Sequence, residues 1–409
     1  MERTGAAMAA RPPQFDARPA GNFPWSDVLQ YMIAPFSSAE FYAEYYERKP
    51  LIVHRSEPGR YSPLLSVEKI DRFIGSADLR GGMVDLADQG RELHREDYVN
   101  EGNLIIRRDI VREYQRGATV ILPQLHHSDP VLASFCQAIE TVFSSHTQTN
   151  IYLTPQGRQG FPTHYDNHDV FVMQVSGRKR WRLYNVAMDT PYRGEGFERN
   201  VHKVGEKVSE FILEPGDCVY IPRGMMHDAN NEGEEASLHI TVGLIVKTWA
   251  DLMLEAVSQL MVEETAFRRS LPVGHARNDF DRTEAQATFK QLTQMIADRA
   301  RMDDAFDLLA DQFIRSRDQD VSDGIMEATA PVTAEMVFCR REFVPWRIAD
   351  DDDLVVLISA GGDTDFPASD VKALERAMSG KPFTLKDLNV KDPVEMVRKL
   401  TAAGAVGSV

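Results

Sequence analysis

Two neighbouring stretches decide the fold: NIYLTP at residues 150–155 and DVFVMQVSGRKRWRLYN at residues 169–185. Together with SEFILEPGDCVYIP (209–222) and ASLHITVGLIV (236–246), they are short runs rich in β-branched and aromatic residues, separated by Gly, Pro or Asn. No helix-length pattern interrupts them. Consecutive short strands joined by turns indicate an antiparallel barrel or jelly roll rather than a parallel sheet.

Helices are predicted before these strands. Ser37 or Ser38 can cap a helix that stops before Pro50, and LIVHR, which follows, is typical of a buried strand. Apolar residues recur at i, i+3 and i+4 over 67–75 and 130–143, as in amphipathic helices. The sequence therefore predicts an α+β protein whose barrel occupies residues 25–247.

Beyond Lys247 the pattern becomes helical, and we expect a helical bundle over 248–330 whose wide apolar stripes suit either a dimer contact or packing within the chain. Residues 331–409 alternate short strands with helices at about 368–378 and 393–403, which is typical of a winged-helix-like domain. The stretch ADDDDLV is acidic where a DNA-reading wing needs Lys or Arg. A structural or protein-contact role is therefore favoured for this domain.

The composition narrows the class of protein. The 409 residues are 43% hydrophobic and 26% charged, which are ordinary globular values. No run reaches the roughly 18 apolar residues that cross a bilayer, and residues 1–24 lack the apolar core of a signal peptide, so they are predicted to be a solvated tail. Three widely spaced cysteines indicate no disulfide framework, and we expect a cytoplasmic protein.

The net charge is acidic. A formal charge of −16 disfavours direct nucleic-acid binding and suits a basic partner, although many proteins are acidic simply for solubility.

The densest group of metal-ligand side chains is PTHYDNHDVFVMQ, with a histidine further on in LEPGDCVYIPRGMMH. His164 and Asp166 are two residues apart at the start of a strand, so the strand period of two places both on one face. His227 is expected to emerge from the loop after Pro222. Two histidines and one carboxylate on one face form the facial triad of non-haem iron(II) enzymes, which leaves positions open for other ligands.

Two alternatives remain open from spacing alone. Catalytic zinc more often uses three histidines or thiolates, and no cysteine is placed to help. His168 shares the strand parity of His164, so a manganese-type site that uses both is also possible.

A cation is also expected inside the barrel. The candidates lie in DVFVMQVSGRKRWRLY: Arg178, Lys179, Arg180 and Arg182. A Lys or Arg buried among strand residues is costly unless an anion pairs with it, so most of the four should be solvated and one inward cation suffices to bind an anion.

At these residues the chain resembles the JmjC-type ribosomal oxygenases, a cupin-like family of 2-oxoglutarate-dependent protein hydroxylases. The likeness covers FYAEYYERKPLIVHR, NIYLTPQGRQGFPTHYDNHDVFVMQVSGRKRWRLY, EPGDCVYIPRGMMH and SLHITVG. It implies a JmjC double-stranded β-helix (cupin) catalytic domain over 25–247, a helical dimerisation domain over 248–330 and a winged-helix-like domain over 331–409. We therefore expect a homodimer.

The resemblance also implies roles for single residues. His164, Asp166 and His227 become ligands of Fe(II), and Lys179 matches the basic partner of the distal carboxylate of the cosubstrate 2-oxoglutarate. Asn150, Tyr152 and Thr241 match polar positions around the cosubstrate, although on spacing alone Tyr152 and Thr241 are ordinary strand residues.

Two features depart from the family pattern. The chain reads HYDNHD where better-known members read something like HYDD, and Gly243 stands where eukaryotic relatives usually carry a hydroxylated side chain. The implied function is hydroxylation of a protein side chain, His or Arg of a ribosomal protein. Alternatives are a peptide or small-molecule hydroxylase, a lysine demethylase, and a non-catalytic cupin that only binds its ligand.

Overall fold

The predicted short strands form two antiparallel sheets in the computed structural model, which describes residues 27–321 and 324–409. The predicted tail over 1–24 lies outside the described residues. The strands of this part are β1 (Leu51–Val53), β2 (Asp85–Ala87), β3 (Thr119–Pro123), β4 (His146–Thr154), β5 (Asp169–Ser176), β6 (Lys179–Val186), β7 (Lys207–Leu213), β8 (Cys218–Ile221), β9 (Met225–Asn231) and β10 (Ser237–Ile245). The larger sheet has the order β1-β8-β5-β10-β4-β3-β2, and the smaller has the order β7-β6-β9. This arrangement fits the predicted jelly roll.

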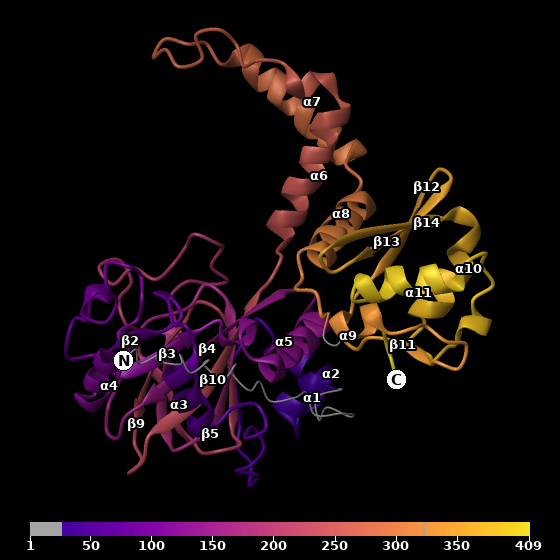
Figure 1. The fold of residues 1–409 in the computed structure, drawn as a ribbon. Helices are drawn as coiled ribbons and strands as arrows, with labels where there is room; N and C mark the ends of the chain where they lie inside the picture. Colours follow the sequence, from indigo (N-terminus) through magenta and orange to yellow (C-terminus); the bar gives the residue numbers. More distant parts are fainter. Residues whose placement is uncertain (1–26, 322–323) are drawn as a thin grey trace, which may run out of the picture. The chain divides into compact units, whose positions relative to one another are not determined.

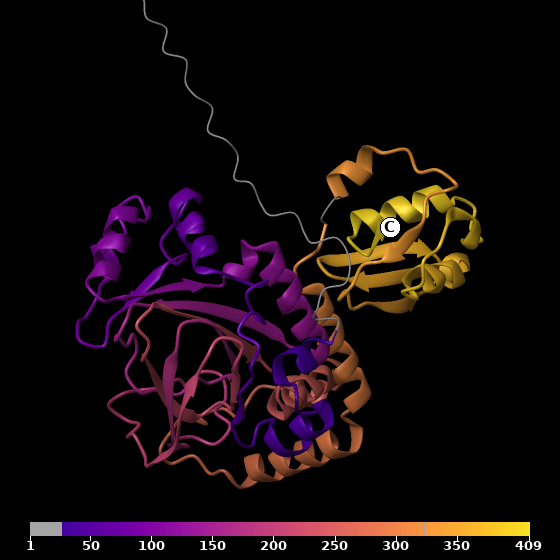
Figure 2. The ribbon, with the colours of Figure 1, turned by 90° about the horizontal axis from the view of Figure 1, so that it is seen from below.

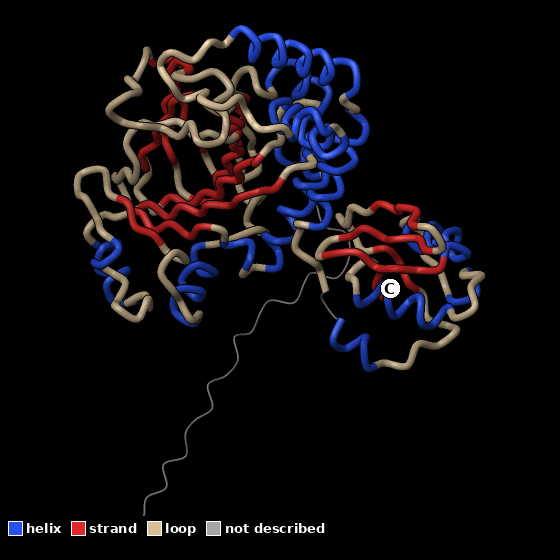
Figure 3. Tube along the Cα trace, turned by 90° about the horizontal axis from the view of Figure 1, so that it is seen from above, coloured by secondary structure: helices blue, strands red, loops and turns tan. Residues whose placement is uncertain are grey.

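The two sheets share an apolar core. Val172 and Val219 of the larger sheet pack with Trp181, Leu183 and Leu213 of the smaller one, and all five are buried. Figure 3 shows the strands of this unit, in red, gathered into two layers. Burying each such side chain contributes roughly 1.5–3 kcal/mol, so this core holds the sheets together around the cavity described below.

The helices predicted over 67–75 and 130–143 are present as α3 (Val67–Ser76) and α5 (Pro130–Phe143), and α2 (Ser38–Glu40) begins at the predicted cap. The first unit also contains α1 (Val28–Ile33) and α4 (Arg107–Gln115), which the periodicity did not predict. Ser37 caps α2 by accepting from the Glu40 N–H at 3.2 Å, and a short π-helical turn over Phe41–Tyr45 continues it. Figure 2 shows α3 and α4, in purple, on the outer side of the larger sheet.

One local prediction was wrong. His227 was expected in a loop after Pro222, but it lies inside β9, which pairs with β6 so that His227 faces Leu183. The run MMHDANN is neither β-branched nor clearly alternating, so its strand character comes from pairing within the smaller sheet rather than from propensity. The segment 209–222 likewise holds two strands, β7 and β8, separated by the Pro215–Asp217 turn.

The chain divides into two units (Figure 1): described residues up to 143 with 147–245, and residues 144–146 with 246–409. The second unit contains α6 (Trp249–Glu263), α7 (Thr283–Arg299), α8 (Met302–Arg315), α9 (Gly324–Thr329), β11 (Phe338–Arg340), β12 (Arg347–Asp351), β13 (Leu354–Ser359), β14 (Gly362–Pro367), α10 (Val371–Met378), α11 (Pro393–Ala402) and β15 (Val406–Ser408). The predicted helices at 368–378 and 393–403 are thus present as α10 and α11.

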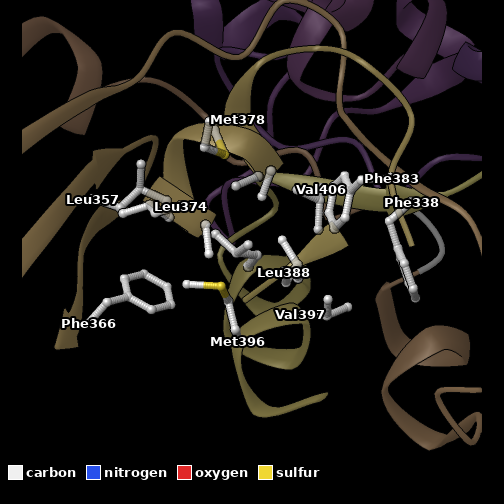
Figure 4. Close-up of a cluster of buried hydrophobic side chains, with 14 of the residues drawn as sticks. Phe338, Leu357, Phe366, Leu374, Met378, Phe383, Leu388, Met396, Val397 and Val406 are labelled. Carbon is white, nitrogen blue, oxygen red and sulfur yellow. The ribbon is translucent and has the colours of Figure 1, made fainter. Parts of the chain in front are cut away.

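The end of the second unit has its own core. Figure 4 shows Leu357, Phe366, Leu374 and Met396 pointing toward one another, with Val406 of the last strand beside them. They come from the three-stranded sheet β12-β13-β14, from both helices and from β15. Within residues 27–321 and 324–409, no helix combines the length and apolar character needed to span a bilayer.

Candidate metal centre

A backbone bridge brings the two predicted histidine ligands, His164 and His227, together. The His227 N–H donates to the His164 carbonyl at 2.7 Å, and the His164 N–H donates to the His227 carbonyl at 3.1 Å. Residues directly opposite each other in an antiparallel pair project to the same face. The imidazole rings consequently lie side by side, with their centroids 4.7 Å apart.

Asp166 is held by the turn that precedes β9. Its carbonyl accepts from the Gly224 N–H at 2.9 Å. Gly224 has a φ of +82°, and a Cβ there would lie 1.8 Å from the Met188 carbonyl oxygen, so only glycine fits this turn. The turn thereby fixes the carboxylate beside both histidines.

The three side chains fit one metal ion. One ligand atom from each of His164, Asp166 and His227 lies within 4.8 Å of the other two. The Asp166 oxygens are 3.9 Å from Nε2 of His164 and 3.6 Å from Nε2 of His227. Two imidazole nitrogens and one carboxylate oxygen are the donor set of a 2-His-1-carboxylate site, which suits Fe(II) and leaves open positions.

Hydrogen bonds fix which nitrogen of each histidine is available. Nδ1 of His164 donates to the Pro162 carbonyl at 2.9 Å, and Nδ1 of His227 donates to the Met225 carbonyl at 3.1 Å. Since a carbonyl only accepts, both rings carry their proton on Nδ1 when neutral. Both Nε2 lone pairs are therefore left for a metal.

Protonation also favours metal binding. Burial, with His164 nearby, lowers the pKa of His227 to about 4, so this imidazole is neutral at pH 7. Burial opposes ionisation of Asp166, but His227 and His164 outweigh it and hold the pKa of the carboxyl below its ordinary value. His227 and Asp166 are thus in the forms that a divalent cation binds.

His168, the alternative ligand, lies elsewhere. The cluster of ligand atoms contains His164, Asp166 and His227, and His168 is not part of it. A Cβ built on Gly243 would meet Cδ2 of His168 at 2.3 Å and Nε2 at 2.5 Å, so the His168 ring lies against the glycine backbone of β10. This geometry argues against the manganese-type site that includes His168.

A cavity extends from the triad between the sheets. His164, Asp166 and His227 line it together with Val170, Val172, Trp181, Lys179 and Thr241. Lys179 is only 4% exposed and donates to Thr154 Oγ1 at 3.1 Å. Burial lowers the pKa of its ammonium from 10.5 to about 7, and no carboxylate pairs with it among the described residues. Lys179 is therefore a buried basic group at a cavity wall without a protein anion, and an anionic ligand beside it would favour its charged form.

The other basic candidates are all paired with carboxylates of the protein. Arg180 pairs with Glu210 and Glu232, and Arg178 pairs with Glu214. Arg182 pairs with Asp228. The expectation of one inward cation among the four is thus met by Lys179.

The predicted polar residues divide into two groups. Tyr152 and Thr241 both line the cavity. Burial raises the pKa of Tyr152, so its hydroxyl stays protonated. Asn150, two residues before Tyr152 in β4, is half-buried and is not among the lining residues, so its role stays a prediction.

Sequence reasoning missed two buried polar residues of this cavity. Asp228, next to His227, accepts from Thr163 Oγ1 at 2.7 Å, from the Tyr184 hydroxyl at 2.7 Å and from Arg182, and so ties the segment before His164 to β9. His239 lies beside Lys179. The alternation of SLHITVG could have revealed His239, since it shares the strand face of Thr241.

A jelly roll with two imidazoles, one carboxylate and a buried cation around one cavity defines a cupin-type metal site. Residues 123–252 match the JmjC domain family. The chain is 30% identical over 309 residues to ribosomal oxygenase 1 of Gallus gallus, covering 71% of this chain and 51% of that protein. It is 29% identical over 320 residues to the bifunctional lysine-specific demethylase and histidyl-hydroxylase NO66 of Aedes aegypti, covering 75% and 50%. The predicted resemblance is therefore confirmed, and the chain spans about half the length of these curated relatives.

Solved structures agree on the fold. The ribosomal oxygenase YcfD of Escherichia coli is similar, with a TM-score of 0.52 at 15% identity over 91% of this chain and 98% of that chain. At this identity the likeness concerns the fold alone.

Replacing Asp166 with Ala should weaken metal binding by roughly 100-fold or more, because it removes one of three ligands, whereas His168→Ala should retain the affinity. Titration with Co(II) under anaerobic conditions, followed by visible absorption, measures this and should give one ion per wild-type chain. Equal losses in both variants would instead support the site that includes His168.

Replacing Lys179 with Met should stabilise the ligand-free protein. The pKa of Lys179 is lower in the folded state, so the folded protein binds fewer protons than the unfolded chain between pH 7 and 10.5, and wild-type stability falls as pH decreases through this window. Methionine removes that cost, and we expect the free energy of unfolding to rise by on the order of 2–4 kcal/mol at pH 7.5. Urea denaturation measures it, with exposed Lys203→Met as a neutral control. If Lys179→Met is less stable than the wild type, the prediction that the unpaired lysine lowers the stability of the ligand-free protein is wrong.

Proposed function

We propose that this chain is an Fe(II)- and 2-oxoglutarate-dependent oxygenase that hydroxylates a protein side chain, His or Arg of a ribosomal protein. The observation that carries the proposal is the buried, unpaired Lys179 in the same cavity as His164, Asp166 and His227. A metal site alone fits many reactions. A metal site with a cation deeper in the same cavity fits a cosubstrate that chelates the metal at one end and carries a carboxylate at the other.

The names of similar proteins support this proposal. Relatives are named ribosomal oxygenases or histidyl-hydroxylases, and YcfD has been solved in complex with cobalt and 2-oxoglutarate. In that complex we take cobalt to stand in for the catalytic metal. The acidic balance of this chain, −16, suits a basic ribosomal protein and disfavours direct binding to nucleic acid.

Each residue of the cavity has a part in the proposed reaction. His164, Asp166 and His227 hold the metal on one face, and Lys179 orients the far carboxylate of the cosubstrate, with Asn150, Tyr152 and Thr241 as further polar contacts. Val170, Val172 and Trp181 exclude water. With Fe(II) and 2-oxoglutarate bound, dioxygen is consumed as 2-oxoglutarate is decarboxylated to succinate and one oxygen atom enters a substrate C–H bond.

Mass spectrometry tests the reaction directly. Incubating a total ribosomal protein extract with the enzyme, Fe(II), 2-oxoglutarate and air should add one oxygen atom to a His or Arg residue, together with succinate. His164→Ala should lose both products, because the metal loses a ligand, and the exposed His275→Ala should keep both. If the wild-type protein forms succinate but oxidises no ribosomal protein, the substrate assignment fails and a peptide or small molecule becomes the better substrate class. If it forms no succinate, the cavity only binds its ligand.

Lysine demethylation is the second candidate, because the NO66 relatives are named as bifunctional demethylases and histidyl-hydroxylases. Hydroxylation of an N-methyl group releases formaldehyde. The same incubation with methyl-lysine peptides therefore separates the two activities: formaldehyde supports demethylation, and a retained oxygen supports side-chain hydroxylation.

We further propose that the chain is a homodimer formed through a helical domain over 248–330. Large apolar side chains on α6 and α7 are exposed: Trp249 73%, Leu254 63% and Phe289 73%. None of the residues of α7, all described, is buried. A helix this exposed is marginal by itself, so a second copy is a physically reasonable cover.

Replacing Phe289 with Glu should weaken this dimer by at least about 10-fold, because it places a charge in an apolar contact. Light scattering after size exclusion should give twice 46.1 kDa for the wild type and a shift toward 46.1 kDa for the variant. Gln294→Glu on the same exposed helix is the charge-matched control. A wild-type mass of 46.1 kDa at micromolar concentration would contradict the dimer.

Two broader assignments belong to the same proposal. The winged-helix-like domain over 331–409 is proposed as a protein-contact element, in keeping with the acidic hairpin between β12 and β13. A cytoplasmic location fits the three free cysteines.

A further inference from the structure

Lys179 has a buried imidazole as its neighbour. Its Nζ lies 3.3 Å from Nδ1 of His239 and 3.1 Å from Oγ1 of Thr154. Lys179 and His239 are 4% and 3% exposed, and both line the cavity. An ammonium group has three N–H donors, so two of them are used by the protein and one remains for a ligand.

The contact with Lys179 determines the tautomer of His239. Burial lowers the pKa of His239 well below its ordinary value, and the charge of Lys179 lowers it further, so the ring is neutral. In its charged form Lys179 can only donate, so Nδ1 of His239 then accepts. A neutral imidazole that accepts at Nδ1 carries its proton on Nε2.

The ring of His239 is held firmly in one orientation. It stacks on Tyr152 with centroids 4.8 Å apart and planes 9° apart, and Trp181 meets it edge-on at 5.7 Å. Among the described residues, Nε2 of His239 has no hydrogen-bond partner. Because His239 lines the cavity, this nitrogen is available to donate to a ligand there.

We propose that the Nε2–H of His239 is a second donor to the far carboxylate of the cosubstrate, so that Lys179 and His239 bind this group together. The proposal rests on the proposed function and adds a residue to it. His239 comes from β10 of the larger sheet and Lys179 from β6 of the smaller one. The carboxylate therefore joins the two sheets at this end of the cavity.

The pair also makes the cavity selective. Lys179 is a compact charge that attracts any anion, whereas a fixed N–H beside it favours an acceptor with two oxygens in one plane. We therefore expect His239 to distinguish 2-oxoglutarate from 2-oxobutanoate, which keeps the keto acid that chelates a metal but lacks the far carboxylate.

Binding to the Co(II)-loaded protein tests this without turnover. Isothermal titration gives the Kd of 2-oxoglutarate and of 2-oxobutanoate for wild type, His239→Phe and His239→Gln. Phenylalanine keeps the stacking on Tyr152 and removes both nitrogens, whereas glutamine can still accept from Lys179 and donate to the ligand. We expect His239→Phe to raise the Kd of 2-oxoglutarate roughly 10- to 100-fold and that of 2-oxobutanoate less than about 3-fold. His239→Gln should recover at least part of the loss.

The outcomes separate the two proposals. If His239→Phe leaves the Kd of 2-oxoglutarate unchanged, or weakens both ligands equally, His239 does not bind the far carboxylate. If the wild-type Co(II) protein binds 2-oxoglutarate no better than 2-oxobutanoate, the proposed function fails at Lys179 itself. Circular dichroism and the Co(II) spectrum verify that each variant is folded and loaded, and the glutamine variant decides the question if the phenylalanine variant does not fold.

Discussion

The backbone bridge between His164 and His227 is the constraint on which the site depends. Two hydrogen bonds, of 2.7 and 3.1 Å, join a segment that precedes β5 to a strand of the smaller sheet. Because the side-chain period of a strand is two, a slip by one residue would turn one imidazole away from the other. The Thr163–Asp228 hydrogen bond lies directly beside this bridge and secures its register. Backbone pairing thus sets the relative positions of the two imidazoles, and side-chain hydrogen bonds hold that pairing in register.

Burial of Lys179 without a partner carboxylate in the described part of the chain lowers the stability of the ligand-free protein. Lys179 sits at the first position of β6, paired with Leu213 and Asn231, and no carboxylate among the described residues neutralises it. Thr154 and His239 solvate its ammonium with neutral atoms, which keeps the charge available to an anion from outside. A carboxylate at that position would stabilise the protein and close the site. Under the proposed function, protein stability and anion binding therefore place opposite demands on Lys179.

The sequence predicted most strands correctly, but it did not predict the contacts between residues that are far apart in the chain. Alternation and turn signals identified β4, β5, β6 and β10, and the HxD pair with a later histidine picked out three side chains that the structure brings together. The strand β9 was missed because MMHDANN has little β-propensity and pairs only through tertiary context. His239 was missed because a single histidine in a strand resembles a core residue. Its meaning depends on Lys179, which is 60 residues away in sequence and adjacent only once the two sheets face each other.

The glycine at position 243, which departs from the family pattern, is explained by steric crowding in this structure. No positive φ requires glycine there; instead, the His168 ring occupies the volume that a Cβ would fill, at 2.3 Å. The register pairs Gly243 with Val170 and Thr241 with Val172, so the larger sheet presents Thr241 and Val172 to the cavity, and the His168 imidazole covers the next step along the same face. A side chain at position 243 would therefore require the His168 imidazole to move from its present place. The glycine of HITVG therefore leaves the space on β10 that the histidine of HYDNHD occupies in this chain.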